Sequence, residues 1–178
     1  FDRVDAERLL KAGFQIAYHT LRLGEGADTR FNPQERTATL EVIKNSSLKL
    51  AYLVEPVGVE HSAEEIADTF LTGMKYGAAL TGAMARVPVQ GTPLGGLPAV
   101  SERRLAQVVA VTRLAAGRNA PDICVHPPAP LALEWGANLV VVENGAVPRD
   151  TGNSRDEWRC FGLGQAKELF ERAGYKTW

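Results

Sequence analysis

The sequence predicts an α/β domain that forms the carboxyl-terminal portion of a (βα)8 barrel, with about five parallel strands and helices outside them. Strand-like apolar runs alternate with helical segments along the chain, which requires a mainly parallel sheet with right-handed crossovers. Each run is followed by polar residues, and parallel α/β proteins place their chemistry at that end of a strand. A complete barrel takes about 250 residues. The 178 residues therefore predict one domain, 1–178, equivalent to strands 4–8.

The elements follow in order. Apolar spacing and stop signals predict helices at 4–12, 33–45, 62–77, 101–116, 131–135 and 163–173, and strands at 14–21, 48–54, 80–89, 122–125 and 138–142. Asn32 is expected to cap the second helix, and Ser62 with Glu65 forms the capping-box pattern of the third. Gly73 to Gly77 is expected to end that third helix. An open five-stranded sheet is the alternative to a partial barrel.

Composition excludes several classes of protein. The net charge is −1, with 20 basic and 21 acidic residues, so we expect no nucleic-acid partner. No apolar run reaches the roughly 18 residues of a membrane helix. The two cysteines, Cys124 and Cys160, favour a reducing, cytoplasmic compartment over a disulfide scaffold. Because the chain begins at Phe1 without a leader pattern, we expect a processed or excised amino terminus.

Charged residues follow the first two predicted strands. Arg22 and Glu25 come after the first strand, and Arg36 lies in the next helix. Arginine pairs with carboxylates and glutamate accepts from ammonium groups, so this set could bind a zwitterion. A surface salt-bridge network is the alternative. After the second strand, Gly58 permits close backbone approach, and His61 is more typical of a structural histidine than of a catalytic one.

The later strands carry further polar residues. Arg86 interrupts an apolar strand, which is costly unless it faces a lumen or pairs with a charge at the barrel bottom. It is followed by the turn Gly91-Thr92-Pro93-Leu94. His19, His61 and His126 lack the spacing of metal ligands, so no metal site is predicted within the chain. No phosphate-binding loop, nucleophile elbow or complete dinucleotide fingerprint is present.

In order, these clusters resemble the biotin synthase-like branch of the radical S-adenosylmethionine (SAM) enzymes. The resemblance spans nearly the whole chain. It rests on Arg22-x-x-Glu25 with Arg36, on Gly58-x-Glu60, on Gly91-Thr92-Pro93-Leu94 and on Gly136-Ala137-Asn138. Within the branch, the radical SAM maturases of the mono-iron Hmd-type hydrogenase cofactor are nearest, through Glu55-Pro56-Val57-Gly58-x-Glu60-His61 and Pro148-Arg149-Asp150.

The resemblance implies site residues and cofactors. Arg22, Glu25 and Arg36 match positions that hold the amino and carboxylate groups of SAM, and Gly58 lies in a motif that lines the adenosine. Met84, Arg86, His126 and Asn144 would face the barrel mouth, where a small-molecule substrate sits. Such enzymes cleave SAM with a 4Fe-4S cluster and start cofactor biosynthesis with the resulting 5′-deoxyadenosyl radical.

One feature of the family is absent from the sequence. The branch carries three cysteines in a CxxxCxxC-type run after its first strand, and neither Cys124 nor Cys160 can replace it. We therefore expect the cluster ligands in a preceding amino-terminal half or in a partner chain, and this chain alone to be inactive. The alternatives are a cluster-less barrel that binds SAM or another nucleoside, and an aldolase-like barrel enzyme that uses Glu and His as acid and base.

Overall fold

The computed structural model describes residues 1–142 and 161–176. Its strands are β1 (Ile16–Tyr18), β2 (Lys49–Ala51), β3 (Val54–Val57), β4 (Ala78–Ala85), β5 (Asp122–His126) and β6 (Leu139–Val140). They form one parallel sheet in the order β1-β2-β4-β5-β6, and β3 also pairs with β4. Because only two residues separate β2 from β3 and both pair with β4, they are two halves of one strand. The described sheet thus has five sequential parallel strands.

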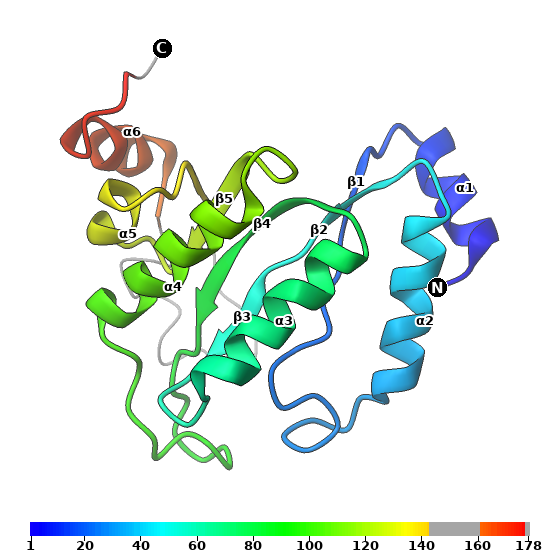
Figure 1. The fold of residues 1–178 in the computed structure, drawn as a ribbon, viewed down its shortest axis with the longest axis horizontal. Helices are drawn as coiled ribbons and strands as arrows, with labels where there is room; N and C mark the ends of the chain where they lie inside the picture. The colour runs from blue at the N-terminus through cyan, green and yellow to red at the C-terminus, as the bar shows by residue number, and fades with distance from the viewer. Residues whose placement is uncertain (143–160, 177–178) are drawn as a thin grey trace.

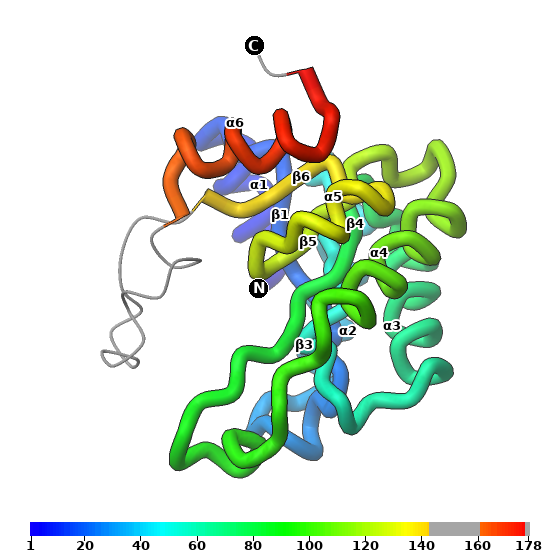
Figure 2. Tube along the Cα trace, turned by 90° about the vertical axis from the view of Figure 1, so that its left-hand side faces the viewer, coloured from blue at the N-terminus to red at the C-terminus, as the bar shows by residue number. Residues whose placement is uncertain are grey.

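The sheet is curled and open, which confirms the partial-barrel part of the prediction. Sequential strands are neighbours throughout, as in a barrel wall, but β1 and β6 end the described sheet without meeting. Figure 1 shows the strands side by side with helices running back along them. Figure 2 shows α3 and α4 together on one side of the sheet. The described residues therefore form a half-barrel.

The helices begin where the sequence places capping residues. They are α1 (Arg3–Lys11), α2 (Pro33–Lys44), α3 (Ala63–Lys75), α4 (Glu102–Ala116), α5 (Pro130–Glu134) and α6 (Leu163–Arg172). The Asn32 side chain accepts from the second residue of α2, and Ser62 with Glu65 forms the predicted capping box of α3. Both satisfy amide groups that have no partner within the helix. Gly73, in contrast, does not end α3. It lies inside the helix, where a Cβ atom would come within 2.5 Å of the Tyr52 ring.

Three predicted strand ends are wrong. The strand predicted at 14–21 ends at Tyr18. The strand predicted at 48–54 continues to Val57, so Glu55 belongs to the strand and does not follow it. The strand predicted at 80–89 ends at Ala85, and Arg86 lies just beyond it. The Arg86 amide still donates to the Val57 carbonyl at 2.8 Å, but Pro88 has no N–H to continue the ladder. Arg86 is therefore a loop residue.

The helix-covered face of the sheet holds the apolar core. One cluster joins β3, β4 and β5 to α3, α4 and α6 and includes Val54, Ala83 and Ile123, all fully buried. A second cluster joins α1 and α2 to β2 through Leu40 and Tyr52. Burial of this apolar area is the main favourable contribution to folding.

Candidate functional site

The sheet has a second face, opposite the helix-covered face that holds the apolar core. We call it the inner face. Because successive side chains in a strand alternate between faces, the core positions Val54, Ala83 and Ile123 place their neighbours Glu55, Gly82, Met84 and Cys124 on the other side. A Cβ atom at Gly82 would lie 2.0 Å from the Cys124 carbonyl oxygen, so glycine is required where β5 passes.

The structure brings Glu25 and Arg36 together at the carboxyl end of β1. The Arg36 Nε atom lies 2.9 Å from the Glu25 carboxylate, which also accepts from the Thr29 hydroxyl at 2.7 Å and from the Arg22 amide at 3.2 Å. Arg36 also donates to the Thr20 carbonyl oxygen through Nε and Nη2, at 3.2 and 2.7 Å. The Glu25 side chain is only 2% exposed, against 24% for Arg36. The pair is a nearly buried, hydrogen-bonded ion pair.

Arg22 makes a second ion pair, which the sequence analysis missed. Its Nε atom lies 3.3 Å from a carboxylate oxygen of Glu55, and the Tyr18 hydroxyl donates to the other oxygen of that carboxylate. Tyr18 and Arg22 flank the end of β1, and Glu55 lies in the adjacent β3. A glutamate inside an otherwise apolar run was the signal in the sequence that could have identified Glu55. We call Tyr18, Arg22 and Glu55 the inner-face triad.

Burial affects the protonation of this triad. Glu55 is 3% exposed, and desolvation raises the pKa of its carboxyl group although Tyr18 and Arg22 favour the charged form. Desolvation and the Glu55 charge raise the pKa of the Tyr18 hydroxyl. Desolvation, with a smaller contribution from Glu55, raises the pKa of the Cys124 thiol to about 12. The triad therefore holds a carboxyl group whose ionisation is costly, and Cys124 stays a neutral thiol at neutral pH.

Gly58 and Arg86 belong to a different cluster, in the loops that follow β3 and β4. Arg86 donates to both carboxylate oxygens of Glu60, at 3.1 and 3.0 Å, and to the Leu94 carbonyl oxygen at 2.9 Å. Desolvation opposes ionisation of Glu60, but the hydrogen bonds and charge of Arg86 outweigh it and lower the pKa of that carboxyl. A Cβ atom at Gly58 would lie 2.1 Å from the Glu60 carboxylate. The Gly58 amide donates to His61 Nδ1 at 3.0 Å.

The remaining predicted mouth residues are only partly brought together. Met84 and His126 are direct partners in the β4–β5 register, and both lie on the inner face. Arg86 is bound to Glu60 and so connects the loop after β4 to the loop after β3. Asn144 lies outside the described residues. Beside Arg86, a cavity of about 300 Å³ is lined mainly by apolar groups, among them Pro88 and Pro127.

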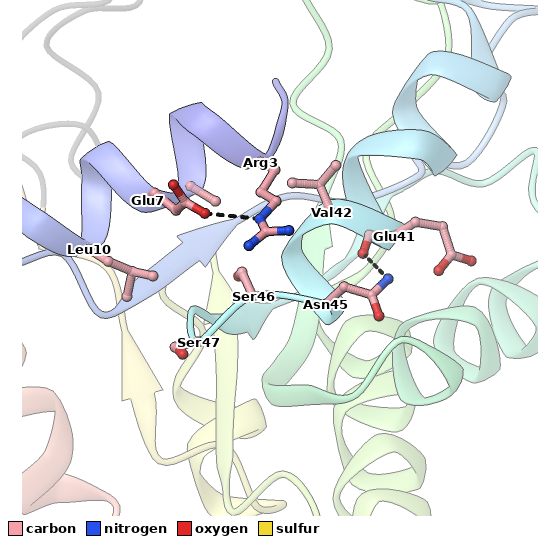
Figure 3. A pocket seen from close by; sticks show the side chains of 9 residues that line it. Arg3, Glu7, Leu10, Glu41, Val42, Asn45, Ser46 and Ser47 are labelled. Carbon is pink, nitrogen blue, oxygen red and sulfur yellow. Dashed lines mark hydrogen bonds and ion pairs between the residues drawn. The ribbon is translucent and has the colours of Figure 1, made fainter.

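A further cavity lies elsewhere. It has a volume of about 600 Å³ and is formed between α1 and the end of α2. Figure 3 shows Arg3 paired with Glu7, at 2.9 Å, and the Asn45 amide donating to the Glu41 carbonyl oxygen at 2.8 Å. The neighbouring Ser47 precedes β2, so the cavity lies at the amino-terminal end of the strands, which barrel enzymes use for stability and not for chemistry. We assign it no function.

The described residues contain no group of three or more His, Cys, Asp or Glu side chains that could hold a metal ion. His19 is instead hydrogen-bonded to the protein backbone. Its Nε2 atom lies 2.9 Å from the Arg36 carbonyl oxygen, and burial lowers the pKa of the ring, which suits a neutral imidazole that donates from Nε2. None of the described helices combines the length and apolar character that crossing a membrane requires.

No protein-family model matches the chain, and no curated protein does. Assignment to a class therefore rests on the fold and the site. They define a parallel α/β half-barrel with two acid–arginine pairs, Glu25–Arg36 and Glu55–Arg22, near the carboxyl end of β1.

Proposed function

We propose that the chain is the SAM-binding half of a radical SAM enzyme's (βα)8 barrel. The observation that carries the proposal is the convergence of Glu25, Arg36 and Arg22 at the carboxyl end of β1. The sequence resemblance gives these three residues to the amino-acid group of SAM. Parallel barrels bind their ligands at that end of the strands.

The two ion pairs suit a zwitterionic ligand. An ammonium group can take the place of Arg36 on the Glu25 carboxylate, and a ligand carboxylate can pair with Arg36 or Arg22. This exchange replaces one ion pair by two without changing the net charge of the buried site, which limits its electrostatic cost. Arg22 and Arg36 are 33% and 24% exposed, so a ligand can reach both guanidinium groups.

The residues present do not fit a 4Fe-4S cluster. Such clusters take three or four cysteine ligands, and the chain has two, of which Cys124 is buried with a raised thiol pKa. The cluster ligands would come from a preceding segment or a partner chain, so no radical step is assigned to this chain. Met84 and His126, with the small cavity beside Arg86, would border the substrate of the assembled enzyme.

The cysteine count also favours a second candidate, a cluster-less barrel that binds SAM without cleaving it. Iron analysis of protein purified anaerobically from its natural source, with an assay for 5′-deoxyadenosine, separates the two candidates. Iron with SAM cleavage supports the enzyme. SAM binding without iron and without SAM cleavage supports the binding protein.

Calorimetric titration tests the site itself. Glu25→Gln should weaken SAM binding about tenfold or more, because the amide cannot pair with an ammonium group. 5′-Methylthioadenosine lacks the amino-acid group and should bind wild type and Glu25→Gln equally. The control is Glu168→Gln, which changes an exposed glutamate of α6 and should leave SAM affinity unchanged. Equal SAM affinity in wild type and Glu25→Gln would contradict the assignment.

A further inference from the structure

The outer surface of α3 and α4 carries exposed apolar side chains that the proposed SAM site does not use. Leu71 on α3 is 58% exposed, and Val111 and Leu114 on α4 are 66% and 82% exposed. A groove of about 550 Å³ runs between the two helices, with Leu71 and Val111 among its lining residues. We call this surface the α3/α4 face. A contiguous apolar surface of this kind marks an interaction site more often than a random surface does.

Charges at the other end of the face are opposite on the two helices. Glu64 lies in the first turn of α3, and Arg104 lies in the first turn of α4. Within residues 1–142 and 161–176, neither side chain makes a hydrogen bond or an ion pair. Both helices return from parallel strands and run side by side in the same direction (Figure 1), so the two charges lie near the same end of the groove. The first turn of α4 also holds Glu102, but its carboxylate accepts from the Leu131 amide. Glu64 on α3 and Arg104 on α4 thus remain available to a partner.

From this arrangement we infer that the α3/α4 face binds the same face of a second copy of the chain. A two-fold axis parallel to the helices places α3 of one protomer on α4 of its partner. Glu64 then meets Arg104 of the partner subunit, and the symmetric contact repeats the pair. Toward the carboxyl ends of the helices, Leu71 meets the partner's Val111 and the partner's Leu114. The face is therefore self-complementary, as a two-fold interface must be.

An antiparallel arrangement of the two protomers does not place Arg104 opposite Glu64 of the partner subunit. If the helices crossed antiparallel, α4 would lie on the partner's α4, and Arg104 would face the carboxyl-terminal half of that helix, where Val111 and Leu114 are exposed and Arg113 is the basic residue of the last turn. The parallel arrangement brings Glu64 opposite Arg104 and the apolar residues opposite each other, whereas the antiparallel one sets Arg104 against the half of α4 that carries Arg113. The interface lies on the helix side of the sheet (Figure 2), so it leaves the inner face available.

Sedimentation velocity tests the inference. The wild-type protein should dimerise at micromolar concentrations. Leu114→Asp should weaken the dimer about tenfold or more, because each interface would bury two unpaired carboxylates. Leu163→Asp is the control, since Leu163 on α6 is also exposed, at 64%, and lies outside the face. Leu114 is so exposed that its substitution should leave the urea unfolding midpoint of the monomer, measured well below the dimer dissociation constant, unchanged. This measurement separates lost association from misfolding.

A charge exchange tests the orientation and the partner. Arg104→Glu should weaken the dimer about tenfold through like-charge contact, and adding Glu64→Arg in the same chain should restore it. SAM affinity should not change in any of these variants, so the result is independent of the proposed function. A wild-type protein that stays monomeric at 100-fold higher concentration overturns the inference, and so does a double variant that remains as weak as Arg104→Glu.

Discussion

The two faces of the sheet differ in the side chains that they bury. The helix-covered face consists of buried aliphatic side chains such as Val54 and Ile123, which need no partner other than one another. The inner face carries the buried acid Glu55 and leaves Ile16 and Tyr18 on β1 about half exposed. Burial stabilises the first face and makes ionisation costly on the second. The difference indicates that the helix-covered face contributes most to stability, and we propose that the inner face serves the ligand.

The largest expected effect tests this division directly. Ile123→Ala on the helix-covered face should lower the free energy of unfolding by about 2–5 kcal/mol, because it leaves a cavity among fully buried neighbours. Ile16→Ala, the same change at a residue that is 51% exposed on β1, should cost no more than about 0.5 kcal/mol. Urea unfolding measures both. Similar losses from the two variants would contradict the division.

An intermediate effect on stability is expected for the ion pair between Glu60 and Arg86, in the loops that follow β3 and β4. Glu60→Gln should cost about 1–2 kcal/mol at pH 7, because Arg86, 9% exposed, loses its charged partner. The folded protein lowers the pKa of Glu60. The contribution is therefore present above the unfolded-state pKa of glutamate and is lost as pH falls through the folded-state value. Urea unfolding of the variant and wild type should converge in acid. Glu168→Gln, at an exposed glutamate of α6 that has no such partner within the described residues, is the control and should show no loss.

Much of the fold follows from local signals in the sequence. Capping residues such as Asn32 and Ser62 identify helix starts because they satisfy amides of the first turn. Apolar runs identify strands, but not their ends. β3 extends past Glu55 because Arg22 and Tyr18 bind a carboxyl group that would otherwise exclude it from a buried strand. Those partners are distant in sequence, so no local pattern contains them.

The candidate site was predictable to a smaller extent. The resemblance grouped Glu25 with Arg36 and Arg22, and the structure places all three at one strand end. The resemblance also assigned Arg86 to the barrel mouth, but it did not contain the bidentate partner of Arg86, Glu60, which lies in the preceding loop, 26 positions away. Which arginine meets which glutamate depends on loop geometry. Residue types alone do not determine it.

Glu55→Gln tests the central claim most directly, with unfolding and SAM titration performed on the same samples. The folded protein raises the pKa of Glu55, so its ionisation costs stability as pH rises from below the unfolded-state pKa through the folded-state pKa. The variant should be more stable than wild type at pH 7, and this advantage should disappear in acid. Its SAM affinity should fall about tenfold because Arg22 loses the carboxylate that positions it. A variant that is less stable at pH 7 and binds SAM as tightly as wild type would show that Glu55 serves the fold, and would contradict the account.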